Sequence, residues 1–111
     1  MGIVIRLGGF VGTALLATAI GAEAQALNEG AAVFAAQKCS MCHALDGKGN
    51  AKGALDGIGT KLKADEIRQW MLTPVEMAAK AQAARKPAMK AVANLPKEDL
   101  DALVAFLAKK K

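Results

Sequence analysis

The stretch Cys39-Ser40-Met41-Cys42-His43 decides the fold of this 111-residue chain. Two residues separate the cysteines, and the only histidine of the sequence follows the second cysteine directly. A helix is expected over about residues 27–38, so the two thiols and the imidazole come close together where that helix ends. Four kinds of site compete for such an arrangement: a zinc site, a redox-active thiol pair, a structural disulfide and a covalently attached haem.

The rest of the sequence favours haem attachment. A structural zinc site needs four ligands, and two cysteines with one histidine supply only three. A thioredoxin-like thiol pair needs a βαβ setting, but the sequence has no run of alternating apolar and polar residues typical of a strand. A disulfide across two intervening residues would constrain the chain very little. A Cys-x-x-Cys-His run can bind one haem through two thioether bonds and ligate its iron through the imidazole.

The composition indicates a core that is short of large side chains. Hydrophobic residues make up 53% of the chain but aromatic residues only 4%, and the formal net charge is +5. With two cysteines, these values exclude a multidomain enzyme, a disulfide-dense scaffold and an acidic disordered tail. A domain of this size usually needs a covalent or cofactor staple, so we expect a flat apolar macrocycle to complete the core.

Residues 1–24 are typical of a secretory signal peptide. A positive charge precedes the uncharged apolar stretch Leu7–Ile20, and two overlapping Ala-x-Ala sites predict a cut before Gln25 or before Leu27. The apolar stretch is shorter than the roughly 20 residues of a membrane-spanning helix, although an uncleaved N-terminal anchor is the alternative interpretation. Residues 25–111 are then the exported domain. It lies in an oxidising compartment, where its two thiols are expected to be bonded to each other or to another group.

The exported domain is expected to be all-α, with helices at about residues 27–38, 64–72, 73–85 and 96–108. Five glycines predict an irregular loop over residues 45–62. Thr73 is expected to be an N-cap, with Pro74 at the first helical position and Glu76 completing a capping box. We expect Pro87 to stop that helix.

The exported domain resembles the class I monohaem cytochromes c of the bacterial periplasm over nearly all of its length. Gly30 and Phe34 match the first helix of the family, and Phe106-Leu107 matches the end of its last helix. These two helices cross at the glycine in the family. Lys86-Pro87-Ala88-Met89 is similar to the loop that carries the distal methionine. The resemblance implies a small cytochrome c fold, about four helices wrapped around one covalently attached haem c.

The segment of residues 52–59 resembles the Gly-Pro-x-Gly-type loop of the family, with one departure. Ala54 stands where the family usually has proline, and in the family the backbone carbonyl at that position accepts the Nδ1–H of the proximal histidine. The resemblance therefore implies a hydrogen bond from His43 to the Ala54 carbonyl. Alanine keeps the carbonyl but lacks the fixed φ of proline.

Cys39 and Cys42 are the expected thioether positions, and His43 is the expected proximal iron ligand. As the only histidine, it leaves the sixth coordination position to a different residue type. Met89 is the expected distal ligand, because it follows Pro87 in an irregular stretch that can bend over a ring.

Other residues keep alternative interpretations. Met41 lies between the anchoring cysteines and cannot reach the far side of the ring. Met77 and Met71 are the remaining candidates for the distal ligand, although methionines within helices are more often core residues. Trp70 either donates its indole N–H to a haem propionate, as its family counterpart often does, or packs on the haem edge.

These observations predict a soluble periplasmic electron carrier that cycles between Fe(III) and Fe(II), and not an enzyme. The scattered lysines favour redox partners with acidic docking surfaces and only transient membrane contact through redox complexes. The sequence shows no aromatic residues among basic ones that would favour nucleic acid, and we expect no small-molecule substrate. Two alternatives stay open: a five-coordinate haem module that binds or senses gas, and a cytochrome subunit of a larger periplasmic oxidoreductase.

Overall fold

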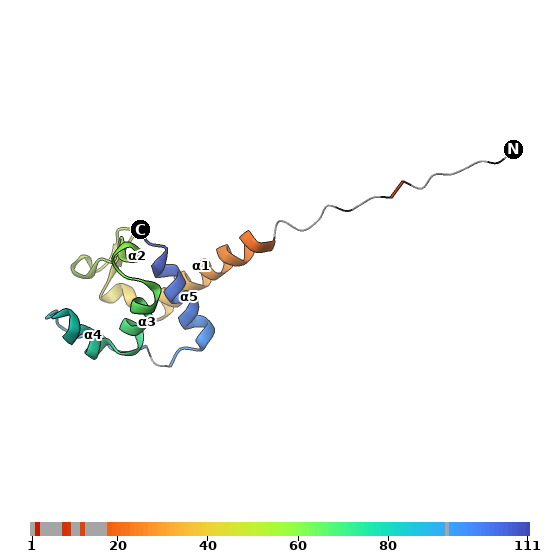
Figure 1. Cartoon of the computed structure of the whole chain (residues 1–111). Helices are drawn as coiled ribbons and strands as arrows, with labels where there is room; N and C mark the ends of the chain where they lie inside the picture. Colours follow the sequence, from red (N-terminus) through yellow and green to blue (C-terminus); the bar gives the residue numbers. More distant parts are fainter. Residues whose placement is uncertain (1, 3–7, 10–11, 13–17, 93) are drawn as a thin grey trace.

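The structure is a computed structural model that describes residues 2, 8–9, 12, 18–92 and 94–111. Residues 1, 3–7, 10–11 and 13–17 of the expected signal peptide lie outside the described residues. The elements are, in chain order, α1 (Thr18–Ala36), the 3-10 turn η1 (Cys39–Met41), β1 (Ala44–Leu45), β2 (Lys48–Gly49), the 3-10 turn η2 (Ala51–Gly53), α2 (Ile58–Lys61), α3 (Ala64–Leu72), α4 (Pro74–Ala81) and α5 (Lys97–Ala108). This mostly helical architecture confirms the predicted fold class (Figure 1).

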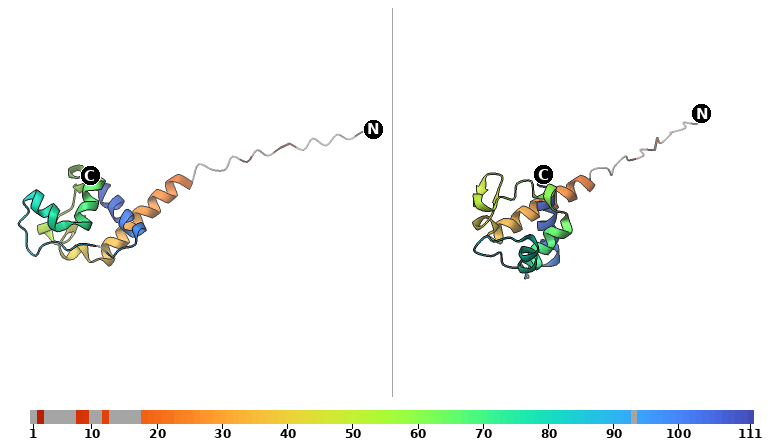
Figure 2. Two further views of the ribbon diagram at one scale, coloured as in Figure 1. Left: turned by 60° about the horizontal axis from the view of Figure 1, so that its bottom comes forward. Right: turned by 60° about the vertical axis from the view of Figure 1, so that its left-hand side comes forward.

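Helices α1 and α5 cross in close contact, which the different views of the ribbon agree in showing (Figures 1 and 2). A Cβ atom on Gly30 would collide with the carbonyl oxygen of Ala102 and with Cβ of Phe106. Beside this point, Phe34 and Phe106 meet edge to face with their ring centroids 6.0 Å apart. The glycine therefore lets the two backbones approach, and the expected crossing of the first and last helices is confirmed.

The core of the described residues is small and mainly aliphatic. It is built from α1, α3, α5 and the strand β1, with Leu103 fully buried at its centre. Its members are Val33, Phe34, Leu45, Ile67, Met71, Leu100, Leu103, Val104 and Leu107.

At the surface, Asp101 on α5 accepts from Arg68 on α3 at 2.8 Å and from Lys97 at 2.7 Å. The hydrogen bond from Lys97, and to a smaller extent the one from Arg68, lowers the pKa of the Asp101 carboxyl.

Helix α1 differs from its prediction at both ends. It begins at Thr18 and not near Leu27, because the residues between them include several alanines, which have the highest helix propensity. It ends at Ala36 and not at Lys38, since Lys38 takes a left-handed conformation with φ of 56°. That residue turns the chain directly into the first cysteine of the motif.

Helix α3 has the predicted bounds, and α5 begins one residue later than predicted, with Pro96 as its N-cap. Helix α4 is shorter than predicted, because Gln82 takes a left-handed conformation with φ of 52° and ends it at Ala81. The predicted capping box at Thr73 was wrong. The hydroxyl of Thr73 donates instead to the Gln69 carbonyl at 3.1 Å, which also accepts the backbone N–H of Thr73 at 2.7 Å.

The glycine-rich segment of residues 45–62 contains more regular structure than predicted. Strands β1 and β2 form a two-residue antiparallel pair, and the four-residue helix α2 begins after Gly57, whose φ of 76° makes the turn into it. Among the described residues, no helix has both the length and the apolar character needed to span a membrane.

Candidate functional site

The Cys-x-x-Cys-His motif forms one tight turn after α1. The backbone N–H groups of Cys42 and His43 both donate to the Cys39 carbonyl, at 3.1 and 2.9 Å. Cys39 is half-buried and packs against the core, whereas Cys42 is exposed, and both thiols are free. Burial raises the pKa of the Cys39 thiol. The turn thus presents two thiols and an imidazole from five consecutive residues, as the sequence predicted.

The imidazole of His43 is held by the backbone of η2. Its Nδ1 lies 2.9 Å from the Gly53 carbonyl oxygen, and because a carbonyl can only accept, Nδ1 carries the proton. The other ring nitrogen, Nε2, is then the one available to a metal ion. The prediction that Ala54 supplies this carbonyl was wrong by one residue. Gly53 therefore occupies the place that the resembled family gives to proline.

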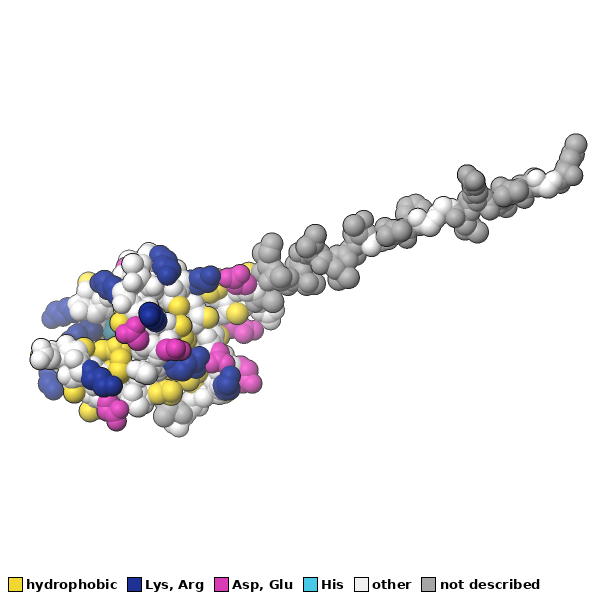
Figure 3. All heavy atoms as spheres, in the orientation of Figure 1, with side chains coloured by type: hydrophobic (Ala, Val, Ile, Leu, Met, Phe, Trp, Pro, Cys, Tyr) yellow, Lys and Arg dark blue, Asp and Glu magenta, His cyan; other side chains and the backbone are white. Residues whose placement is uncertain are grey.

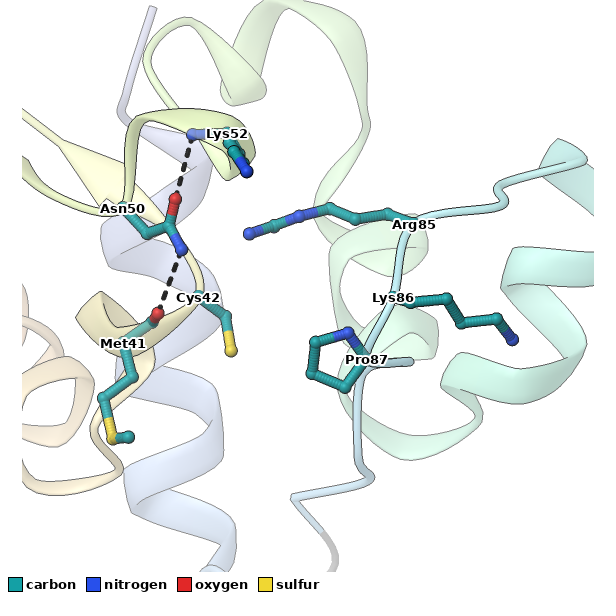
Figure 4. Close-up of a pocket in the computed structure, with 7 residues that line it drawn as sticks. All are labelled: Met41, Cys42, Asn50, Lys52, Arg85, Lys86 and Pro87. Atoms are coloured by element: carbon teal, nitrogen blue, oxygen red, sulfur yellow. Dashed lines mark hydrogen bonds between the residues drawn. The ribbon is translucent and has the colours of Figure 1, made fainter.

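Asn50 positions the turn that carries Gly53. Its side-chain oxygen accepts the backbone N–H of Lys52 at 3.1 Å, and its side-chain nitrogen donates to the Met41 carbonyl at 3.3 Å (Figure 4). Its backbone N–H also donates to the Ser40 carbonyl at 3.1 Å. Sequence analysis missed this residue, although an asparagine just before a short helical turn is a known cap and turn former.

A cavity of about 610 Å³ opens beside the second cysteine of the motif. Figure 4 shows the Cys42 thiol between Met41 and Pro87. Arg85 extends from the segment after α4 toward η2. Three of the lining residues are basic, and the full set is Met41, Cys42, Asn50, Lys52, Arg85, Lys86 and Pro87. Sequence analysis did not single out Arg85, because its place depends on how the segment after α4 folds back.

The structure separates the methionines by environment. Met71 is only 6% exposed within the core, which confirms its interpretation as a core residue, and Met77 is half-buried on α4. Met41 is 70% exposed. Met89 lies in the irregular segment after α4, half-buried and packed against the core. A backbone hydrogen bond of 2.8 Å from Val92 to the Met71 carbonyl fastens this segment to α3.

Trp70 is half-buried on α3, next to the core residue Met71. No hydrogen bond joins its indole to another side chain or to the backbone of the described residues. It does not line the cavity beside Cys42.

The residues on and around the motif fit a covalently bound haem. Two thiols on one turn match the two thioether bonds, and the free Nε2 of His43 is a usual axial donor to haem iron. The half-buried thioether of Met89 is a second donor type that haem iron accepts.

A family model described as Cytochrome c matches residues 27–111 of the chain. The matched region contains the motif, the cavity beside it and the segment that carries Met89. No curated protein and no solved structure matches the chain.

Proposed function

Because the chain belongs to the cytochrome c family, we propose that it is an electron carrier exported to the periplasm, with its haem iron ligated by His43 and Met89. Proteins of this family bind haem c covalently and are typically electron carriers. When bound, the haem supplies one-electron chemistry through its iron. The observation that supports the ligation best is the hydrogen bond from His43 Nδ1 to Gly53, which leaves Nε2 available to a metal.

The chain's own residues hold the cofactor from the proximal side. Cys39 packs against the core and so fixes one attachment point rigidly, while Cys42 places the other beside the cavity. The Gly53 carbonyl fixes the plane of the His43 imidazole and, by accepting a hydrogen bond from its Nδ1–H, makes the ring a stronger electron donor.

Met89 is the proposed distal ligand because of its surroundings. Its side chain is half-buried and packs against apolar core residues. A thioether is a soft donor that favours the ferrous iron, so His/Met ligation raises the reduction potential. Such a site suits a carrier that accepts and returns one electron without changing its ligands.

Replacing Met89 by alanine tests this assignment. Met89→Ala should convert the low-spin haem spectrum to a high-spin one, lower the reduction potential and let the ferrous protein bind carbon monoxide, because one coordination position opens. Met77→Ala is the matched control, since Met77 is also half-buried, and it should keep the low-spin spectrum. Ready binding of carbon monoxide by the unaltered protein would instead favour the gas-binding alternative.

Export is proposed from the N-terminal sequence. The matched region begins at residue 27, which is where the chain would start after the second of the two expected cuts. We propose that residues 1–24 are removed by a cut before Gln25, or 1–26 by a cut before Leu27.

For Trp70, packing on the haem edge and donation to a propionate both remain proposals.

The basic residues around the cavity support a partner with an acidic docking surface. Lys52, Arg85 and Lys86 line the cavity beside Cys42, and Figure 3 shows Lys and Arg side chains spread over the face in view, with hydrophobic side chains between them. Opposite charges accelerate encounter and do so less at high salt, because ions screen them.

Inorganic oxidants of opposite charge can test this surface without the natural partner. Oxidation of the reduced protein by hexacyanoferrate(III) should slow as salt is added, whereas oxidation by tris(phenanthroline)cobalt(III) should accelerate. Lys52→Glu/Lys86→Glu should slow the anionic oxidant about tenfold at low salt. Lys61→Glu/Lys63→Glu carries the same charge change on residues that do not line the cavity, and an equal slowing by this control would argue against a localised docking surface.

A further inference from the structure

The residues at the end of α5 close onto the start of α2. The backbone N–H of Gly59 donates to the Lys110 carbonyl at 2.7 Å, and the Lys111 ammonium donates to the Gly59 carbonyl at 3.0 Å. A Cβ atom on Gly59 would collide with the Ala108 carbonyl oxygen. The C-terminal residues thus bind one end of the loop of residues 46–59, and only a glycine allows this approach.

The other end of the same loop is held by an ion pair. The Lys110 ammonium lies 2.8 Å from the Asp46 carboxylate and 4.9 Å from the centre of the Phe106 ring. The Lys110 side chain is only 26% exposed, so its position is well defined by packing. The backbone N–H of Asp46 donates to the Asp56 carboxylate at 2.9 Å, which joins the two ends of the loop to each other.

This loop carries the carbonyl that holds the proposed proximal ligand. Gly53 lies in its middle and accepts from His43, while the Leu55 N–H donates to the Ala44 carbonyl at 2.8 Å. Asp46 itself follows His43 by only three residues. The contacts of Lys110 and Lys111 therefore hold the segments that carry both the donor and the acceptor of the His43–Gly53 hydrogen bond.

We propose that Asp46 and Lys110 are positioning residues that keep the Gly53 carbonyl on the Nδ1–H of His43 and so set the donor strength of the imidazole. The proposal rests on the proposed ligation of the haem iron by His43. Weakening this hydrogen bond makes the imidazole a poorer donor, which stabilises ferric iron less and raises the reduction potential.

The sign of the potential shift separates positioning from simple charge. Removing the negative charge of Asp46 raises the reduction potential whether the residue acts through its charge or by positioning the loop. Removing the positive charge of Lys110 lowers it if only charge matters, because a cation favours the ferrous state, but raises it if the loop is loosened.

The experiment measures the reduction potential and the amide hydrogen exchange of the exported, haem-loaded protein in three variants: Asp46→Asn, Lys110→Gln and the charge swap Asp46→Lys/Lys110→Asp. Both single variants should raise the potential and accelerate exchange at Gly59 and Leu55 by about two- to fivefold, the factor expected for loss of one exposed ion pair. The double variant should restore both quantities toward those of the unaltered protein. Lys109→Gln is the control, because Lys109 is exposed and the ion pair of Asp46 is made by Lys110.

A lowered potential in Lys110→Gln, equal to that of Lys109→Gln and without faster exchange, would overturn the proposal. So would a double variant that exchanges as fast as the single ones. In these cases a retained low-spin spectrum would leave the proposed ligation intact. Failure of that ligation shows differently, as a spectrum of the unaltered protein that is not of the His/Met type.

Discussion

Exported protein with both Cys39→Ser and Cys42→Ser will carry no covalently bound haem and will not fold stably. Without the two sulfurs no thioether can form, and His43 alone would hold the haem by a reversible bond. The described core is also small, with a single fully buried large side chain, so the macrocycle is needed to complete it. We expect less than about a tenth of the normal yield of exported protein, and no haem after denaturing extraction.

Ser40→Ala is the control for this experiment, because Ser40 is exposed between the two cysteines and is not expected to hold the haem. It should keep normal yield and colour. Helical circular dichroism of the purified proteins would show whether folding was lost together with the haem. A double serine variant that stays folded and coloured after extraction would refute covalent attachment through these residues.

Gly30→Ala should destabilise the haem-loaded protein, although alanine is the better helix former. Helix propensity alone would make the change favourable by about 1 kcal/mol. The added methyl group, however, collides with the Ala102 carbonyl and with Phe106, and overpacking a close contact costs about 1–3 kcal/mol. Since one obstacle is backbone, α1 and α5 must separate, and we expect a net loss of up to about 2 kcal/mol.

Guanidinium unfolding of the haem-loaded protein, followed by circular dichroism, measures this loss. Ala35→Gly is the matched control on the exposed side of α1 and should cost about 1 kcal/mol through propensity alone. Gly30→Val should cost more than Gly30→Ala, because its side chain is larger. A stabilised Gly30→Ala variant would mean that α1 and α5 do not approach as closely as described.

Local sequence predicted the parts of the fold whose causes are local. The bounds of α3 and the course of α5 follow from apolar spacing and the charges at the helix ends, and both predictions were confirmed. The C-terminal ends of α1 and α4 could not be predicted from local sequence. They depend on Lys38 and Gln82, which take left-handed conformations that are uncommon for residues other than glycine.

The candidate site divides in the same manner. The motif of residues 39–43 is contiguous, so its chemistry could be predicted from its spacing together with the composition of the rest of the chain. The acceptor for His43 and the roles of Asn50 and Arg85 depend on how separate segments approach one another, which spacing does not determine. The error between Ala54 and Gly53 has this cause: the resemblance identified the loop, but its register relative to the imidazole is a tertiary property.

The crowding around Gly53 ties that position to a distant one. A Cβ atom there would collide with the Arg85 guanidinium and with the Cys42 carbonyl oxygen. Of these two obstacles, the arginine is the far end of a flexible side chain and can move, whereas the Cys42 carbonyl is backbone of the motif. Any side chain at position 53, including the proline of the wider family, would therefore require the turn of the motif to shift as well as Arg85. Consensus design of this protein should for this reason leave position 53 as glycine.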